Sequence, residues 1–225
     1  MIVAVIPARG GSKRIPRKNI VPFAGRPLLA WSIAAARTAP SIQSAWVSTD
    51  DDEIASVAEA HGARVIRRPA AFAGDDTSTL DVIVHALQSI RVEGVTPTAV
   101  MTLQPTNPLR PIAMIEDAVA RFTSSRCDSL VSVSVRPLKV GRVVAGYFEP
   151  TYDFGQQSRL TEPIAFENGL LYITRVTTLD GGSLCGRRIL AFETARPFDD
   201  VDIDEPVDIT LGECIFGAVK DVIDY

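Results

Sequence analysis

The residues best suited to chemistry lie in a loop between positions 7 and 19. This loop holds the pair Gly10 and Gly11 and five cationic side chains, with no acidic residue among them. The cations are Arg9, Lys13, Arg14, Arg17 and Lys18. Glycines let a backbone approach a ligand so that its N–H groups point at an anion, and cations complete such a cradle. The loop therefore predicts a polyphosphate site; the competing interpretation is a solvated basic loop, because exposed cations repel only weakly in water.

The position of the loop favours the polyphosphate interpretation. It follows the apolar run 2–6, whose β-branched residues predict a strand buried on both faces. Loops after the first strand of an open α/β sheet are where such folds bind ligands. The loop matches neither G-x-x-x-x-G-K-[ST] nor G-x-G-x-x-G, which disfavours a P-loop ATPase and a dehydrogenase.

A second chemical feature is the acidic pair Asp202 and Asp204. Alternate side chains of an extended segment share a face, so both carboxylates are predicted to point together while Val201 and Ile203 face the core. Adjacent carboxylates repel unless a cation lies between them, and Mg²⁺ held through oxygen is the expected ion. The alternative is that Asp204 caps the helix opening at Pro206 and Asp202 is merely solvated. The basic loop in the same chain favours the metal site, because phosphoryl-transfer sites combine both parts.

Strand and helix patterns alternate along the chain and supply the elements that position these residues. Strands are predicted at 45–49, 65–66, 99–103, 129–135, 169–173 and 189–192, and helices at 28–37, 82–87 and 112–122. Four strand–helix steps in order predict a mostly parallel α/β sheet with helices on both faces. Asp50, three residues before Glu53, is predicted to cap a further helix. His85 lies mid-helix among apolar neighbours and is interpreted as a packing residue rather than a catalyst.

Two further segments depart from this rhythm. Prolines at 105 and 108 exclude regular structure, so Gln104 and Arg110 are expected on a stiff loop at a strand end. From about 137 to 166, short apolar and polar residues alternate between glycines and prolines, which predicts an extended hairpin or arm. Such arms often pair with a second subunit, so a homodimer is predicted. Residues 1–225 are expected to form a single domain that carries this arm.

Composition limits the partners and the compartment. The 225 residues carry a net charge of −4, which argues against a general nucleic-acid binder. The three cysteines, Cys127, Cys185 and Cys214, are odd in number and far apart, which favours a reducing compartment over a disulfide framework. The first apolar run is too short for a signal peptide, and no stretch reaches the roughly 20 apolar residues of a membrane span. A soluble, cytoplasmic protein is expected.

The opening loop resembles the nucleotide loop of the acylneuraminate-type cytidylyltransferases, which make CMP-sialic and other CMP-nonulosonic acids. The likeness continues along nearly the whole chain, in order and at similar spacing. Its pieces are Arg9 to Asn19; Ser48-Thr49-Asp50; Arg68-Pro69 with Asp75 and Thr79; Leu103-Gln104-Pro105-Thr106-x-Pro108-Leu109-Arg110; Pro137-x-Lys139; Arg159; Asn168-Gly169-x-x-Tyr172; and Asp202-x-Asp204. The resemblance implies a Rossmann-like α/β/α sandwich with a projecting dimerisation arm.

The resemblance also implies a role for individual residues. The catalytic set would be Arg9, Lys18, Asp202 and Asp204, with Asp202 and Asp204 holding Mg²⁺. The nucleotide, CTP, would be bound by Ala8, Arg9, Gly10, Ser12, Lys13, Lys18, Asn19, Arg68 and Thr79. The acceptor, a 2-keto sugar acid, would meet Gln104, Lys139, Arg159 and Asn168, and one of the arm residues would come from the partner subunit.

The implied reaction joins a ring hydroxyl of the sugar acid to the α-phosphorus of CTP and expels pyrophosphate. Asp202 and a metal-bound water are alternative acceptors for the hydroxyl proton. Where sialic-acid enzymes often carry an aromatic pair, this chain reads Leu184-Cys185-Gly186, so the sugar acid is left open within the nonulosonic class. The alternatives are a 3-deoxy-manno-octulosonate cytidylyltransferase and a non-catalytic nucleotide-binding module.

Overall fold

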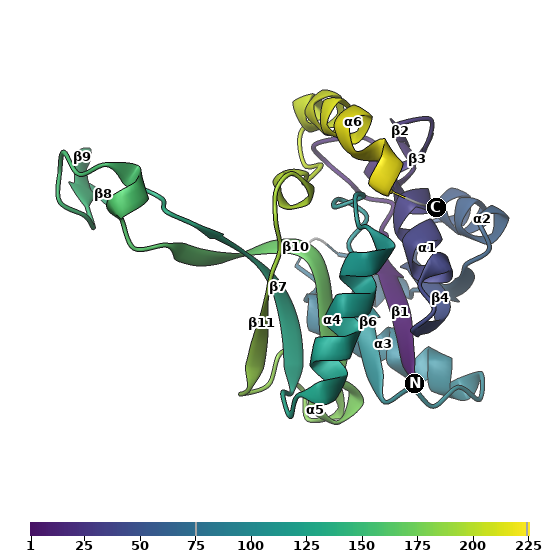
Figure 1. Cartoon of the computed structure of the whole chain (residues 1–225). Coiled ribbons are helices and arrows are strands. Elements are labelled where there is room, and N and C mark those ends of the chain that lie inside the picture. The colour runs from purple at the N-terminus through teal and green to yellow at the C-terminus, as the bar shows by residue number, and fades with distance from the viewer. Residues whose placement is uncertain (75, 224) are drawn as a thin grey trace.

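The computed structural model describes residues 1–74, 76–223 and 225 and shows a layered α/β body with an arm projecting from it (Figure 1). A seven-stranded sheet forms the middle layer, in the order β11, β7, β10, β6, β1, β4, β5. Its strands are β1 (Ile2–Pro7), β4 (Ile42–Thr49), β5 (Arg64–Arg67), β6 (Ala99–Thr102), β7 (Ser129–Arg136), β10 (Ile164–Arg175) and β11 (Ile189–Glu193). The helices are α1 (Leu28–Thr38), α2 (Asp52–Ala60), α3 (Thr79–Val92), α4 (Ile112–Ser124), α5 (Val176–Asp180) and α6 (Pro206–Val219).

Strand β1 is the axis of the sheet. Val3, Ala4, Val5 and Ile6 are all fully buried, which confirms the prediction of a strand covered on both faces. β1 lies between β4 and β6 and is parallel to both. The chain first builds outward through β4 and β5 and then returns to the other side of β1 with β6. This reversal of strand order creates a crevice at the carboxyl end of β1, where open α/β sheets bind ligands.

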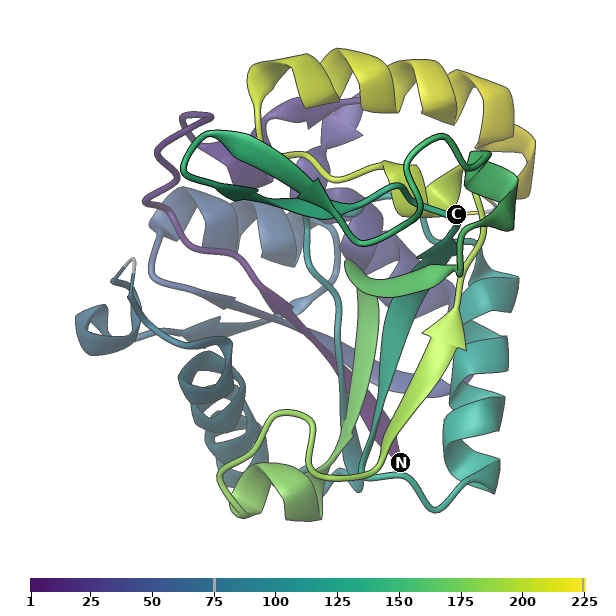
Figure 2. The same ribbon diagram turned by 90° about the vertical axis from the view of Figure 1, so that its left-hand side faces the viewer.

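Helices cover the sheet on both sides, as Figure 2 shows for α3 and α4. One core cluster joins the sheet to α1, α2 and α4, through residues such as Ile33, Ile54 and Ile115. A second joins the opposite face to α3 and α5, through residues such as Leu87 and Leu179, and a third packs α6 against Phe23 and Trp31. The predicted mostly parallel sheet with helices on both faces is therefore confirmed.

Two elements differ from the local pattern. β10 is antiparallel to both β6 and β7, and its pairing with β7 is irregular between Glu167 and Tyr172. The short helix α5 follows directly and was not predicted from the sequence.

The cap of α2 is Asp51, whose side chain accepts hydrogen bonds from the backbone N–H groups of Glu53 and Ile54. The prediction that Asp50 caps this helix is wrong by one residue, because the Asp50 carboxylate instead accepts the N–H of Gly10.

The irregular segment of β10 depends on Gly169. Its φ is +76°, and a Cβ at this position would lie 2.6 Å from Oδ1 of Asn107. We expect Gly169→Ala to lower the free energy of unfolding by about 1–3 kcal/mol, from backbone strain and the clash together. Gly94→Ala is the matched control, since Gly94 has φ +80° and open space around it. Thermal unfolding should show the larger loss at Gly169; equal losses would mean that the contact with Asn107 is unimportant.

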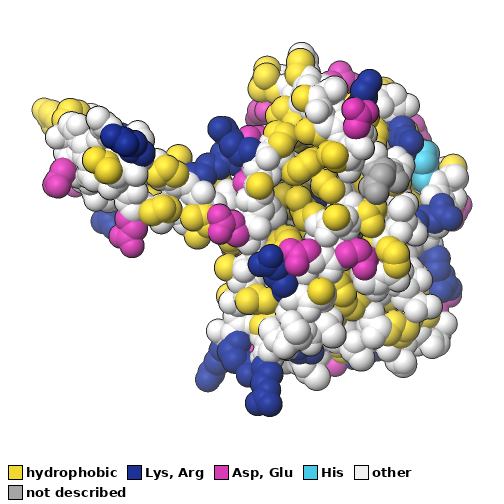
Figure 3. Space-filling view, viewed as in Figure 1, with side chains coloured by type: hydrophobic (Ala, Val, Ile, Leu, Met, Phe, Trp, Pro, Cys, Tyr) yellow, Lys and Arg dark blue, Asp and Glu magenta, His cyan; other side chains and the backbone are white. Residues whose placement is uncertain are grey.

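The predicted arm at about 137–166 is a narrow two-stranded ribbon that leaves the body where β7 ends and returns into β10 (Figure 1). Its strands, β8 (Gly141–Val144) and β9 (Tyr147–Pro150), pair only with each other. Apolar side chains stand exposed along it, including Val143 and Tyr147 at 76% and 77% exposure. Figure 3 shows apolar side chains both on the arm and on the upper part of the body. A lone hairpin is marginally stable in water, so a surface of this kind favours pairing with a partner.

The remaining small elements are the β2 (Pro22–Phe23) and β3 (Arg26–Pro27) hairpin and several single-turn 3₁₀ segments. Across the described residues, no helix has the length and apolar character that crossing a bilayer requires.

Candidate active site

A cavity of about 480 Å³ opens at the carboxyl ends of β1 and β6, at the crevice that the strand order creates. Residues from the basic loop, from the segment before α3 and from the loop after β6 line it. They are Pro7, Arg9, Ser12, Lys13, Arg14, Lys18, Asn19, Arg68, Thr77, Thr79, Val82, Gln104, Pro105 and Thr106. Eight residues predicted to bind nucleotide or acceptor are thus brought to one space.

The basic loop is shaped by hydrogen bonds made by its own polar residues. Asn19 is buried, and its amide donates to the carbonyl oxygen of Arg9 at 2.9 Å, which ties the two ends of the loop together. Arg17 adopts a left-handed conformation with φ 57° and pairs with Asp51 and Glu53 at the start of α2. Arg17 therefore fastens the loop to α2 and does not line the cavity, unlike the other four cations of the loop.

The backbone at Ala8 and Gly10 has structural partners, and neither residue lines the cavity. The N–H of Ala8 donates to the carbonyl of Ser48 at 2.9 Å, and the N–H of Gly10 donates to Asp50 at 3.0 Å. A Cβ on Gly10 would lie 2.7 Å from a carboxylate oxygen of Asp51. Gly10 is thus required for close packing of the loop on the start of α2. Its N–H group could donate to a phosphate only if its hydrogen bond to Asp50 were broken.

The opposite wall of the cavity is built by Arg68 and the start of α3. Arg68 is buried, and its guanidinium donates to the side chain and the carbonyl of Ser48 at 3.2 and 2.7 Å. Burial lowers the pKa of Arg68, with attraction from Asp50 opposing the shift and Arg9 adding to it. Thr79 is the first residue of α3, so the partial positive charge of the helix N-terminus faces the cavity. Asp75 belongs to the same stretch of sequence but lies outside the described residues.

Asp204 of the acidic pair contacts the basic loop at the edge of this cavity, although neither Asp202 nor Asp204 lines it. Nζ of Lys18 lies 2.7 Å from Oδ1 of Asp204, across 186 positions of sequence, and Nη1 of Arg14 lies 3.1 Å from Oδ2. Val201 and Ile203 are buried while Asp202 is exposed, so the predicted alternation is confirmed. The predicted convergence of the two distant segments is confirmed as well.

The competing interpretation of Asp204 as a helix cap is wrong. Glu205 occupies the cap position of α6, and a capping box pairs it with Asp208. The carboxylate of Asp208 accepts the backbone N–H groups of Asp204 and Glu205 at 2.9 and 2.6 Å. Because this box satisfies the helix end, the side chain of Asp204 is left to face the cations of the loop.

The two acids of the pair differ in their electrostatics. The hydrogen bond from Lys18 is the main cause that lowers the pKa of Asp204, with Lys18 and Arg14 adding charge attraction. For Asp202, partial loss of hydration raises the pKa, and repulsion from Asp204 adds to this, while Thr106 and Lys18 oppose it. Asp202 would therefore gain more than Asp204 from a bound cation. Among the described residues, no group of three or more His, Cys, Asp or Glu side chains is placed to hold a metal.

The loop after β6 holds the backbone of residues 201–203 in place through hydrogen bonds. The N–H of Ile203 donates to the carbonyl of Thr106 at 2.8 Å. Asn107 is buried, and its amide donates to the carbonyls of Asn168 and Val201 at 3.1 and 3.0 Å. These bonds fix the backbone on both sides of Asp202. The role of Asn107 was missed from the sequence, where only its neighbouring prolines gave a signal.

Three predicted acceptor residues lie apart from the cavity in this chain. Lys139 and Arg159 are in the arm, where Lys139 lies over the ring of Tyr152 and Arg159 donates to Gln157. Asn168 donates to the side chains of Ser134 and Thr194 and lines no part of the cavity. In the single chain these hydrogen bonds stabilise the irregular segment of β10, which is a structural role for Asn168.

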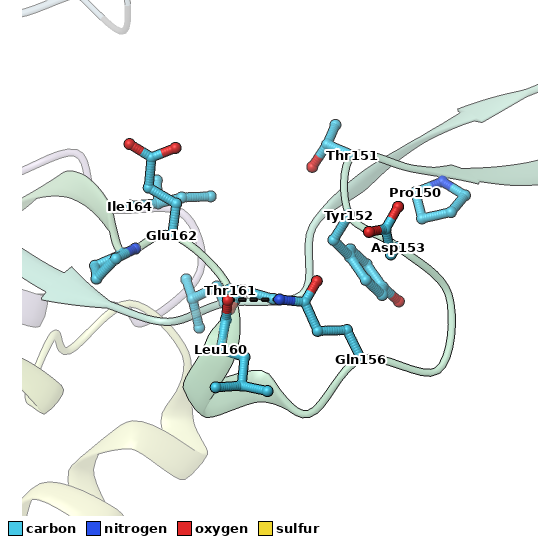
Figure 4. Close-up of a pocket in the computed structure, with 11 residues that line it drawn as sticks. Pro150, Thr151, Tyr152, Asp153, Gln156, Leu160, Thr161, Glu162 and Ile164 are labelled. Carbon is cyan, nitrogen blue, oxygen red and sulfur yellow. Dashed lines mark hydrogen bonds between the residues drawn. The ribbon is translucent and has the colours of Figure 1, made fainter.

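A larger hollow of about 620 Å³ lies within the arm, where Gln156 donates to the carbonyl of Leu160 (Figure 4). None of the predicted site residues lines it. Its walls carry the acids Asp153 and Glu162 and no cation, which makes it unsuited to a polyphosphate. The cavity at β1, which is lined by five cationic side chains, is therefore the better candidate for a phosphate site.

Thr77, Val82 and Thr106 also line the cavity and were not predicted from the sequence. Val82 lies one helical turn after Thr79, and Thr106 is two positions after Gln104. Val82 and Thr106 each lie close in sequence to a predicted site residue, so the sequence could have predicted that they line the same cavity.

The sheet order, the cationic cavity at its switch point and the acidic segment beside it define an α/β protein with a site suited to a polyphosphate. The chain belongs to the cytidylyltransferase family: the sequence profile of that family, described as cytidylyltransferase, matches residues 3–144.

Individual relatives cover most of this chain. It is 34% identical over 220 residues to N-acylneuraminate cytidylyltransferase A of Danio rerio, covering 92% of this chain and 49% of that protein. It is 31% identical over 230 residues to the CMP-N,N'-diacetyllegionaminic acid synthase of Legionella pneumophila, covering 94% of each. The chain thus spans about half the length of several curated relatives it matches. A solved CMP:2-keto-3-deoxy-manno-octonic acid synthetase, complexed with CTP, shares the fold with a TM-score of 0.73, at 19% identity and coverage of 96% and 98%.

Proposed function

We propose that this protein is a cytidylyltransferase that transfers CMP from CTP to a nonulosonic (sialic-type) acid and releases pyrophosphate. The observation that carries the proposal is the meeting of Lys18 with Asp204 at the edge of one cavity. It puts a cationic phosphate cradle and a metal-type acid pair within reach of the same ligand, in a chain whose relatives carry the names of CMP-sugar acid synthases.

In the proposed reaction, a ring hydroxyl of the sugar acid gives its proton to Asp202 or to a water molecule, and its oxygen forms a bond to the α-phosphorus of CTP. The bond from that phosphorus to the bridging oxygen of the β-phosphate breaks, and pyrophosphate leaves with the bond's electron pair. Both reactants are anions, so charge must be screened before they meet. Arg9, Ser12, Lys13 and Lys18 line the cavity and would hold the triphosphate, while Arg68 and Thr79 would lie at the cytidine. Alignment and electrostatic stabilisation would supply most of the acceleration.

Asp202 and Asp204 fit a Mg²⁺ ion. Mg²⁺ requires only one or two carboxylates, because water and phosphate oxygens complete its shell. Carboxylate oxygens are hard donors of the kind that Mg²⁺ prefers. The pKa of Asp202 is raised by lost hydration and then by repulsion from Asp204, so a divalent cation would stabilise its charged form. When bound, the ion would supply charge for the α-phosphate and its attacking oxygen. Lys18 now neutralises Asp204 and would be drawn toward the triphosphate.

The sugar acid would lie beside Gln104, the predicted acceptor residue that lines the cavity. Lys139 and Arg159 would meet its carboxylate from the arm, supplied by a partner subunit. The hydroxyl of Tyr172 donates to Glu167, and neither Tyr172 nor residues 184–186 line the cavity, so the assignment of residues 184–186 to the acceptor rests on the resemblance. Because the sequence there is Leu184-Cys185-Gly186 and lacks an aromatic pair, the acceptor is proposed as a member of the nonulosonic class rather than one named acid.

Pyrophosphate release with each of the four NTPs and a panel of 2-keto sugar acids tests the proposal. Release with CTP, Mg²⁺ and a nonulosonic acid is the expected result. Release only with 3-deoxy-manno-octulosonate would favour that alternative, the acid for which the synthetase that shares this fold is named. CTP binding without turnover on any acid would favour a non-catalytic module and overturn the proposal.

We also propose that the arm pairs two copies into a homodimer. Val143 and Tyr147 are exposed in the single chain, so acidic residues there leave its fold intact. Val143→Glu with Tyr147→Glu is expected to convert the dimer to a monomer in sedimentation velocity and to lower turnover, because the arm residues would no longer reach the partner's cavity. Val92→Glu is the control, an exposed apolar residue on α3 in the body. A monomeric wild-type chain at micromolar concentration would contradict the pairing.

The three cysteines are all free in the structure. This agrees with a reducing compartment, and we propose the cytoplasm as the site of the reaction.

A further inference from the structure

Arg110 is the one arginine in the described residues that is fully buried. Burial lowers its pKa to about 10, against opposing attraction from Tyr225 and Asp202. Its guanidinium donates to neutral oxygen atoms, and the described part of the chain places no carboxylate at ion-pair distance from it. A buried charge without such a partner is unfavourable compared with apolar packing, so its presence calls for a function beyond stability.

The three acceptors of Arg110 come from three different elements. Nη2 donates to the carbonyl oxygen of Gln104 at 2.6 Å, Nη1 donates to Oγ of Ser32 on α1 at 2.9 Å, and Nε donates to the carbonyl of Leu170 on β10. The planar guanidinium has a fixed fork geometry, so it sets the positions of these three segments relative to one another.

The backbone of Gln104 receives most of this support. Its carbonyl oxygen also accepts from Oγ of Ser32 at 3.4 Å and from the N–H of Asn107 at 3.3 Å. Ser32 is itself fully buried. The side chain of Gln104 lines the cavity, so the buried group behind it determines where that side chain enters.

We propose that Arg110 is a positioning residue for the acceptor: through the carbonyl of Gln104 it holds the Gln104 side chain where the sugar acid binds. The inference rests on the proposed function, because it assigns the sugar acid to the Gln104 side of the cavity. CTP is bound by the basic loop, Arg68 and the start of α3, none of which contacts the Arg110 side chain. A displaced Gln104 therefore weakens binding of the acceptor and spares the nucleotide.

The test compares Arg110→Lys with Gln104→Ala in steady-state kinetics with CTP, Mg²⁺ and the accepted sugar acid. Lysine keeps the charge and loses the fork. Both variants are expected to raise the KM of the acid about 10- to 100-fold, since small misplacements of a positioning group have effects of this size. The KM of CTP is expected to change less than about twofold, and the double variant should be no worse than Gln104→Ala alone, because the two residues act as a unit.

Ser32→Ala is a milder second variant in case Arg110→Lys fails to fold. It removes one support of the same carbonyl and is expected to raise the KM of the acid about threefold or more. If either folded variant lowers kcat at unchanged KM values, or raises the KM of CTP equally, the residue is only structural and the inference is wrong. Wild-type turnover with an unchanged acid KM in the variants overturns the inference alone. Absence of wild-type turnover on every acid overturns the proposed function, and the inference falls with it.

Discussion

Replacing Lys18 with methionine is expected to lower turnover by about 10²–10³-fold, the size of effect seen when one preorganised donor to a developing negative charge is removed. The Lys18 side chain is only 15% exposed, lines the cavity and points at Asp204. Methionine keeps the length and apolar contacts of the stem and removes only the charge. Pyrophosphate release under saturating CTP, measured beside wild type, is the readout.

Arg14→Met is the matched control for Lys18→Met. Arg14 contacts the same carboxylate, but its side chain is 57% exposed, so solvent screens its charge. We expect a loss at least tenfold smaller than for Lys18→Met, and Lys18→Arg should restore part of the activity because it keeps the charge. Equal losses for Arg14→Met and Lys18→Met would show that the loop acts only through its total charge.

Lys18→Met should also change how the stability of the protein depends on pH. The hydrogen bond and charge of Lys18 hold the pKa of Asp204 below its ordinary value in the folded protein. A group with a lowered folded-state pKa contributes stability above its unfolded pKa and loses that contribution as the pH falls through the folded pKa. The difference in Tm between wild type and Lys18→Met should therefore be larger at neutral pH and shrink in acid. A constant difference would mean that the pair contributes nothing to folding.

The sequence predicted the parts of this site that depend on local pattern. The buried run before the loop, the alternation around Asp202 and the breaks at the prolines each follow from the properties of one short segment. The convergence of the basic loop and the acidic pair was predicted by two general rules: ligands bind where strand order reverses, and phosphoryl-transfer sites pair cations with a metal. No single segment contained that information.

What the sequence did not predict depends on bonds between distant segments. Arg17 belonged to the cationic run, but its left-handed backbone turns it toward Asp51 and Glu53. Asn168 was interpreted as an acceptor residue, but its amide satisfies hydroxyl groups on neighbouring strands. One-residue shifts, such as the helix cap at Asp51 in place of Asp50, arise because Gly10 competes for the Asp50 carboxylate. Each of these contacts joins residues 26 or more positions apart, which local periodicity does not encode.

Asp204→Asn is expected to reduce turnover by about 10³-fold while changing the free energy of unfolding by less than about 1 kcal/mol. The amide keeps the shape of the side chain and removes the charge that we assign to Mg²⁺. Asp204 is partly exposed and Arg14 beside it is well exposed, so water replaces much of the lost interaction, and only the mostly buried Lys18 loses a partner. Asp202→Asn should behave alike in turnover and should be neutral or slightly stabilising, because it removes the repulsion that contributes to the raised pKa of Asp202, whose first cause is lost hydration.

Asp208→Ala, four positions beyond Asp204, is the control because it should give the opposite profile. Its carboxylate closes the capping box of α6, so alanine is expected to lower stability by about 0.5–2 kcal/mol, with a fall in kcat far smaller than that of Asp204→Asn. Magnesium supplies the discriminating readout: EDTA should abolish wild-type turnover, and Asp204→Asn should require about tenfold more Mg²⁺ for half-maximal activity. If Asp204→Asn instead loses stability in step with activity and shows an unchanged Mg²⁺ requirement, Asp204 is a structural partner of Lys18 and the metal must be held elsewhere.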